Sequence, residues 1–237
     1  MPSLRQRLVQ SALRFRASCR NELLRGSVVV QRRGPVHRVL RDLYLFSRRH
    51  PVDVHQWDEE YSGDYTERLE TINHVAHHAV IMGYLTYGTK KPTILDVGCG
   101  HGRLLRLLAG FDFAEYVGMD WSSRAVEQAR SLSIPNTRFE IADMNHWETT
   151  DRFDAVVLNN CLSYADDPSE MFHRALGWLA EDGIAVVAMY RGLGAHYIWT
   201  LIQSQAVEKV AACTVRDERT GAFWDIKVLR PALAIAT

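Results

Sequence analysis

The sequence contains little of what marks secreted, membrane-spanning or zinc-binding proteins. It has only four cysteines in 237 residues, and these lie far apart without forming a Cys-x-x-Cys pair. We therefore expect reduced thiols in a cytoplasmic protein, and neither a disulfide framework nor a bound metal. No uncharged apolar run approaches the roughly 20 residues that a membrane-spanning helix needs. The composition, with 47% hydrophobic and 24% charged residues, is typical of a globular protein.

Lysine is missing from residues 1–50, and acidic residues are almost missing too. This segment has 12 Arg against Glu22 and Asp42, a charge of +10, while the rest of the chain carries −10 and the formal net charge is zero. Apolar residues at helical spacing near its start predict a short basic amphipathic helix. Four interpretations fit: a solvated extension, a cap over a substrate pocket, a peripheral membrane contact or an organelle transit peptide. We expect an Arg-rich extension or cap at 1–60 and the main domain at 61–237.

From residue 64 onward, the hydrophobic pattern alternates between helical and strand-like periods. After a helix expected at about 64–85, short apolar runs predict strands at 93–97, 116–119, 138–141, 153–158 and 183–190. The further helices are expected at 103–109, 122–132, 168–180 and 193–205. This alternation predicts βαβ units around a parallel sheet. Two β-like runs at 207–216 and 222–229, joined by a short polar stretch, predict a hairpin after the parallel strands.

A glycine-rich loop follows the first predicted strand. Asp96 lies at the end of that strand, and Gly98, Gly100 and Gly102 follow it in a GxGxG pattern. Glycine allows unusual backbone angles and lets the main chain come close to a ligand. The pattern differs from the GxGxxG of dinucleotide-binding folds. Because ligands bind at the carboxyl ends of strands in such sheets, the loop predicts a binding site.

Two more acidic residues follow the next two predicted strands. Asp120 ends the second strand, where an acid can accept hydrogen bonds from both hydroxyls of an adenosyl ribose. Asp143 follows the third strand, where it can accept a hydrogen bond from an adenine amino group. Acids at three successive strand ends therefore predict an adenosyl site more specifically than a glycine loop alone.

The runs ILDVGCGHGR, GMD, IADM and FDAVVLNNCLSYADDP, in this order and spacing, resemble the class I S-adenosylmethionine-dependent methyltransferases. The resemblance covers about residues 60–230, and it is strongest to the compact small-molecule enzymes of quinone and natural-product pathways. It implies an α/β, Rossmann-like, doubly wound sheet of seven strands, mostly parallel with an antiparallel last strand, besides an N-terminal helical extension. It also implies S-adenosylmethionine as the cofactor and S-adenosylhomocysteine as its product.

The resemblance also assigns roles to particular residues. The loop under the methionine part of the cofactor would consist of Asp96, Gly98, Cys99, Gly100 and Gly102. Asp120 would hold the ribose, with Trp121 beside the adenine, and Asp143 and the Met144 backbone would hold the adenine edge. Asn159 would lie near the sulfonium at the end of the fourth strand. The aromatic residues that would close over the cofactor are Tyr61 and Tyr65.

Two residues are candidates for the chemistry of methyl transfer. His196 follows the fifth predicted strand, where the family's substrate pocket opens, and histidine is the commonest general base for a hydroxyl acceptor. Tyr164 stands where many family members carry histidine. His74, His77 and His78 lie on the entry helix, and because no third metal ligand is evident we expect them to be packing or surface residues.

We therefore expect a methyltransferase that moves a methyl group to an oxygen or nitrogen of a small molecule, and an aromatic region after the fifth strand favours a planar or apolar acceptor. One alternative is an RNA or protein methyltransferase that holds its substrate with the basic N-terminal segment. Another is a non-catalytic adenosyl-binding regulator. The −10 charge of the main domain and the lack of a recognisable RNA-binding module argue against a nucleic-acid partner.

Overall fold

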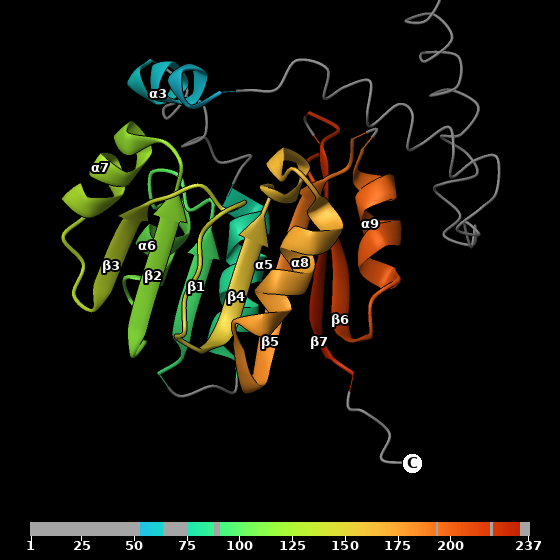
Figure 1. Ribbon diagram of the computed structural model, residues 1–237. Coiled ribbons are helices and arrows are strands. Elements are labelled where there is room, and N and C mark those ends of the chain that lie inside the picture. The colour runs from blue at the N-terminus through green and yellow to red at the C-terminus, as the bar shows by residue number, and fades with distance from the viewer. Residues whose placement is uncertain (1–52, 64–74, 88–90, 193, 219, 233–237) are drawn as a thin grey trace, which may run out of the picture. The chain divides into compact units, whose positions relative to one another are not determined.

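The computed structural model describes residues 53–63, 75–87, 91–192, 194–218 and 220–232, which are drawn in colour in Figure 1. The basic helix expected within residues 1–50 lies outside the described residues, and so do Tyr65 and His74. All of the described residues belong to one compact unit.

Seven strands form a single sheet, in the order β3-β2-β1-β4-β5-β7-β6. Their bounds are Thr93–Val97 for β1, Glu115–Asp120 for β2, Thr137–Ile141 for β3, Phe153–Asn159 for β4, Leu179–Tyr190 for β5, Val207–Arg216 for β6 and Phe223–Pro231 for β7. The neighbouring pairs among β1 to β5 are parallel, whereas β7 is antiparallel to both β5 and β6. The prediction of a mostly parallel seven-stranded sheet with an antiparallel last strand is therefore confirmed.

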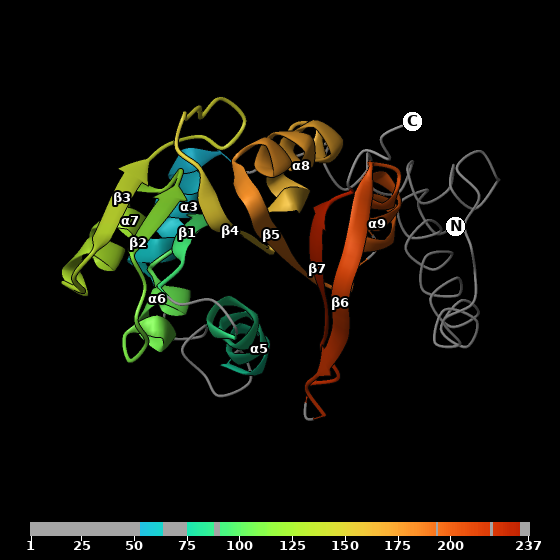
Figure 2. The same ribbon diagram turned by 90° about the horizontal axis from the view of Figure 1, so that it is seen from below.

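The sheet separates two hydrophobic cores. Along β4, Val156 and Leu158 pack into one core with α8 (Pro168–Gly177) and α9 (Ala195–Gln203). The alternate residues Ala155 and Val157 pack into the other core with α5 (Val75–Thr86), α6 (Arg103–Leu108) and α7 (Ser123–Ser131). Figure 2 shows α8 and α5 on opposite sides of the strands. Because both faces are covered, these strands are apolar almost throughout.

Within the described residues, two element boundaries differ from the predictions by more than two residues. The helix expected to reach residue 180 ends at Gly177, and β5 begins at Leu179 and not at Gly183. The cause is that Leu179 already pairs with Phe153, before a register shift in the β4–β5 ladder. A side chain at Gly183 would lie 2.8 Å from the Phe153 carbonyl oxygen, so glycine is needed for this irregularity.

Helix α3 (Val54–Ser62) is an element that the hydrophobic periodicity does not indicate. Asp53 caps it by accepting a hydrogen bond from the Gln56 backbone N–H at 2.9 Å. Asp58 accepts hydrogen bonds from the Ser122 hydroxyl at 2.6 Å and from the Arg124 backbone N–H at 3.3 Å. These bonds tie α3 to the start of α7, at the end of the sheet to which the parallel strands point (Figure 1). The expected boundary between residues 60 and 61 falls inside α3, and the division into extension and domain stays a prediction.

The helices of the described ranges are short. The longest, α5, has 12 residues. No helix in this part of the chain has the length and apolar character needed to cross a membrane.

Candidate active site

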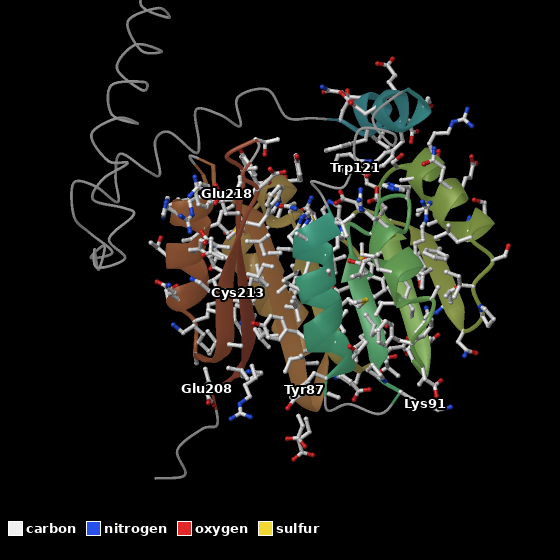
Figure 3. All side chains as sticks on the ribbon, turned by 180° about the vertical axis from the view of Figure 1, so that it is seen from behind. Tyr87, Lys91, Trp121, Glu208, Cys213 and Glu218 are labelled. Atoms are coloured by element: carbon white, nitrogen blue, oxygen red, sulfur yellow. The ribbon has the colours of Figure 1, made fainter. Side chains whose placement is uncertain are left out.

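A cavity of about 210 Å³ opens at the carboxyl ends of β1, β2 and β4. Figure 3 labels Trp121 at this end of the sheet, whereas Tyr87 and Lys91 lie at the opposite end. The predicted cofactor residues that line the cavity are Tyr61, Asp96, Gly98, Cys99, Gly100, Asp120, Trp121, Met144 and Asn159. The fold therefore brings most of the predicted cofactor residues together in one place.

The glycine loop forms the floor of this cavity. Gly98 and Gly100 have φ angles of +71° and +54°, in the region that favours glycine. A Cβ on Gly98 would lie 2.9 Å from the Cβ of Cys161, and one on Gly100 would lie 2.6 Å from the Tyr61 hydroxyl. Both positions need glycine for space as well as for backbone conformation. The backbone N–H groups of Gly98 and Cys99 donate to the Met119 carbonyl oxygen at 2.8 and 3.0 Å, which joins the loop to β2.

Asp120 holds the loop in place from the end of β2. One carboxylate oxygen accepts a hydrogen bond from the Gly100 backbone N–H, and the other accepts one from the Ser122 backbone N–H, both at 2.9 Å. Burial raises the pKa of Asp120, while these backbone hydrogen bonds act to lower it. Each carboxylate oxygen has more than one lone-pair site, so Asp120 can accept further hydrogen bonds from a ligand in the cavity.

Asp96 is a buried carboxyl group at the end of β1. Only 3% of the residue is exposed, and the carboxyl accepts a hydrogen bond from the Tyr116 hydroxyl at 2.5 Å. Burial raises the pKa of Asp96 to about 7; the Tyr116 hydrogen bond lowers it and the charge of Asp120 raises it. Burial also raises the pKa of the thiols of Cys99 and Cys161, so both thiols stay protonated at neutral pH.

Aromatic side chains form a further part of the cavity wall. Tyr61 is buried, and its ring centroid lies 6.0 Å from that of Trp57. Trp57 in turn meets Tyr164 edge-on, with ring centroids 5.2 Å apart. All three residues line the cavity. Burial raises the pKa of Tyr164, so its phenol is a hydrogen-bond donor and not a base at neutral pH.

Two predicted cofactor residues, Gly102 and Asp143, are not among the residues that line the cavity. Gly102 has a φ of +80°, and a Cβ there would lie 2.9 Å from Leu132 and 3.1 Å from Ala129. It therefore permits α7 to pack against the loop. One oxygen of Asp143 accepts hydrogen bonds from the backbone and side-chain N–H groups of Asn145, each at 2.9 Å. The residues on either side of Asp143 line the cavity, but Asp143 does not.

His196 lies on α9 and is not among the residues that line the cavity. Burial lowers the pKa of His196, the nearby Asp225 raises it, and Arg191 and Lys227 lower it. The structure therefore does not bring this predicted general base to the cavity, and its catalytic role stays a prediction. Tyr164, the other predicted catalytic residue, does line the cavity.

Several lining residues were not assigned to the cofactor or to catalysis from the sequence. His77 and His78 of α5 line the cavity, and so does Asn160 after β4. His77 is buried and stacks on Trp224, with ring centroids 4.6 Å apart and planes 6° apart. His78 contacts Asn159 through Nε2, which lies 3.0 Å from the amide nitrogen. The spacing of the histidines on the entry helix was the sequence feature that could have pointed to these positions. We expected packing or surface residues there, whereas His78 lines the cavity and contacts Asn159.

Metal binding has no support in the part of the chain that the structure describes. No group of three or more His, Cys, Asp or Glu side chains there is placed to hold a metal ion. In the same residues Cys99, Cys161 and Cys213 are free thiols.

Comparison with known proteins identifies the family. A family model described as a methyltransferase domain matches residues 67–219. A trans-aconitate 2-methyltransferase of Variovorax paradoxus is 33% identical over 98 residues, which are 40% of this chain and 38% of that protein. A trans-aconitate 2-methyltransferase of an Acidovorax species is 25% identical over 186 residues, which are 73% of this chain and 67% of that protein. The first two curated relatives are thus matched over about two fifths of their length.

A solved structure shows the same fold. The N-methyltransferase NodS of Bradyrhizobium japonicum, in complex with S-adenosylhomocysteine, superposes with a TM-score of 0.66 at 16% identity, over 75% of this chain and 97% of that one. The order of the strands, the glycine loop at the end of β1 and the family match agree with one another. The chain belongs to the methyltransferase-domain family, within the class I S-adenosylmethionine-dependent methyltransferase superfamily.

Proposed function

We propose that this protein is an S-adenosylmethionine-dependent methyltransferase that acts on a small-molecule acceptor. The observation that carries the proposal is the Asp120 carboxylate, which fixes the glycine loop and lines the cavity at the end of β2. When bound, the cofactor supplies a methyl group on a cationic sulfur. The protein's task is then to align the acceptor with that methyl group and to exclude water.

The cavity lining fits the parts of this cofactor. Asp120 has lone pairs left to accept hydrogen bonds from the ribose hydroxyls. Trp121, Ala142 and Met144 provide an apolar lining for the adenine ring. The methionine part would lie against the backbone of Gly98 and Gly100, which line the cavity without side chains.

The charges of the cavity also suit a cationic ligand. Asp96 and Asp120 are two carboxyl groups in one cavity, and burial raises the pKa of both. The sulfonium and ammonium groups of the cofactor are cations that favour the ionised carboxylates. Binding of the cofactor would therefore lower the pKa of these groups.

A small acceptor is supported by the curated relatives, which are named for methyl transfer to trans-aconitate. Trp57, Tyr164 and His78 line the cavity and provide aromatic and polar contacts for the acceptor.

Calorimetry with S-adenosylmethionine and S-adenosylhomocysteine tests the proposed cofactor. We expect both to bind the purified full chain at one site, and absence of binding would refute the proposal. Turnover is then tested by mass spectrometry of S-adenosylhomocysteine formed with candidate acceptors. Binding without any turnover would favour an adenosyl-binding regulator over an enzyme.

A further inference from the structure

The loop that follows β3, residues 142–148, is held by a guanidinium outside the cavity. It contains no helix or strand, so its backbone groups need other hydrogen-bond partners. Nη1 of Arg174, on α8, donates to the carbonyl oxygens of Met144 at 3.0 Å and Asn145 at 2.7 Å. Nη2 donates to the carbonyl oxygen of Trp147. One side chain thus satisfies three backbone acceptors of this loop.

The guanidinium is itself fixed in position. Its Cζ lies 5.4 Å from the centre of the Trp178 ring, which is a cation–π contact. Trp178 meets the ring of Trp147 edge-on, with centroids 5.1 Å apart, and both indoles are buried. Nη2 of Arg174 also lies 3.1 Å from Oε1 of Glu148. Only 16% of the Arg174 side chain is exposed, so its hydrogen bonds to the carbonyls are shielded from water, in which they would be weaker.

The same loop forms part of the cavity wall. Ala142 and Met144 are its lining residues, and because both side chains are apolar, the polar groups that they can offer to a ligand are backbone groups. The Ala142 N–H donates to the Asp120 carbonyl oxygen at 2.9 Å. The Met144 carbonyl oxygen accepts from Arg174, and the Met144 N–H has no acceptor among the described residues. That N–H is therefore the donor that this part of the wall offers to a ligand.

The three N–H groups that follow Met144 are used within the loop. The Asn145 N–H donates to the Asp143 carboxylate at 2.9 Å. The N–H groups of His146 and Trp147 donate to the Asp143 carbonyl oxygen at 3.0 and 2.9 Å. These bonds close a tight turn, which the guanidinium attaches to α8.

A free N–H in this place distinguishes between purine bases. N1 of adenine has a lone pair and accepts a hydrogen bond, whereas N1 of hypoxanthine carries a hydrogen and cannot accept one. A site with a fixed N–H donor therefore rejects hypoxanthine, because both donors lose their partners. An irregular loop keeps such a donor in place through the contacts that hold its backbone, and here Arg174 supplies three of them.

We propose that Arg174 is a positioning residue for recognition of the base: it holds the Met144 N–H where that group donates to N1 of adenine. This inference rests on the proposed methyltransferase function. Arg174 acts through the loop and not on the cofactor itself, since it lies outside the cavity lining. Lysine does not replace it, because a single ammonium nitrogen cannot span the acceptors that Nη1 and Nη2 reach together.

Calorimetry of the full chain with two ligands tests the proposal. S-adenosylhomocysteine carries adenine, and S-inosylhomocysteine differs from it only in carrying hypoxanthine. The natural sequence should bind the adenine ligand at least about tenfold more tightly. In Arg174→Lys, affinity for the adenine ligand should fall by about 3- to 10-fold, as for one neutral hydrogen bond. Affinity for the hypoxanthine ligand should stay within about twofold, because that ligand never had the bond; an equal fall for both ligands would show a structural role only.

Arg130→Lys is the matched control. Arg130 also lies in the last turn of a helix, α7, and its Nη2 donates to the Phe139 carbonyl oxygen at 2.7 Å. Phe139 belongs to β3 and does not line the cavity. We expect both affinities to be unchanged in this variant. If it lowers the preference for adenine as much as Arg174→Lys does, the effect does not come from the loop.

A second pair of variants addresses the donor directly and serves if Arg174→Lys does not fold. Met144 follows the first residue of the turn that the His146 N–H closes on the Asp143 carbonyl, a position at which proline is favoured. Met144→Pro removes the N–H, and Met144→Ala removes the side chain but keeps the N–H. The preference for adenine should be lost in Met144→Pro and kept in Met144→Ala.

The outcomes separate the two proposals. Failure of the natural sequence to bind S-adenosylhomocysteine refutes the proposed function itself. Binding without a preference over S-inosylhomocysteine, or a preference that Arg174→Lys leaves unchanged, refutes only the role of Arg174. If Arg174→Lys does not fold, an unchanged preference in Met144→Pro refutes it instead.

Discussion

Replacing Asp96 with Asn should stabilise the unliganded protein at alkaline pH. The carboxyl is 3% exposed, and its pKa is raised from 3.8 to about 7. An ionised Asp96 is therefore costly to bury. Asn is similar in size and keeps an oxygen that can accept the hydrogen bond from the Tyr116 hydroxyl. The substitution thus removes the buried charge and preserves the local contact.

The magnitude follows from the shift in pKa. Because the folded-state pKa lies above the unfolded-state value, the stabilising contribution of Asp96 is present below about pH 4 and is lost as the pH rises through 7. A shift of this size corresponds to about 4 kcal/mol in all. About 2 to 3 kcal/mol of that loss falls between pH 5 and pH 8.

Urea unfolding at pH 5 and pH 8 measures the effect. The difference in unfolding free energy between Asp96→Asn and the natural sequence should grow in favour of the variant by about 2 to 3 kcal/mol over this interval. Asp112→Asn serves as the control for removal of an acidic side chain, because Asp112 is exposed. A difference for Asp96→Asn that is independent of pH would refute the assignment of a raised pKa to this residue.

Three further predictions concern the cavity. Asp120→Asn should weaken S-adenosylhomocysteine binding by about 10- to 100-fold in calorimetry, because it removes a charged hydrogen-bond acceptor; unchanged affinity would show that Asp120 does not hold the ribose. Gly100→Ala should lower this affinity at least about tenfold, since a left-handed Ala is strained by about 1–2 kcal/mol and its Cβ would lie 2.6 Å from the Tyr61 hydroxyl; Gly100→Ala in the background of Tyr61→Phe tests how much of the loss comes from the hydroxyl. His196→Ala should leave the kcat of methyl transfer within about twofold, because His196 is not in the cavity lining; a fall of a hundredfold or more would support its predicted role as the base.

The strands and the cofactor loop could be predicted because their signals are local. Each strand is a short apolar run, and Asp96, Gly98 and Asp120 lie within two residues of a strand end. Parallel strands bring their carboxyl ends to one edge of a sheet. A residue at the end of a strand is therefore placed by the fold class alone. The confirmed sheet follows from the same periodicity.

The contact between His78 and Asn159 could not be predicted in this way. His78 and Asn159 are 81 positions apart, and their contact depends on how α5 packs against the sheet. Asp143 shows a different limit of prediction from sequence. It follows a strand end as predicted, but one of its carboxylate oxygens accepts hydrogen bonds from Asn145. Asn and Asp readily bond to nearby backbone and side-chain groups in turns. Strand position alone therefore does not determine which way such a side chain faces.

The order of the last two strands has a consequence for synthesis of the protein. β7 follows β6 in the chain but lies between β5 and β6 in the sheet. A nascent chain that has reached Arg216 therefore has an open edge on β5, and β6 has no strand with which to pair. Exposed strand edges can pair with other chains. Until Phe223–Pro231 is in place, the edge of β5 is therefore the part of the sheet most open to pairing with another chain.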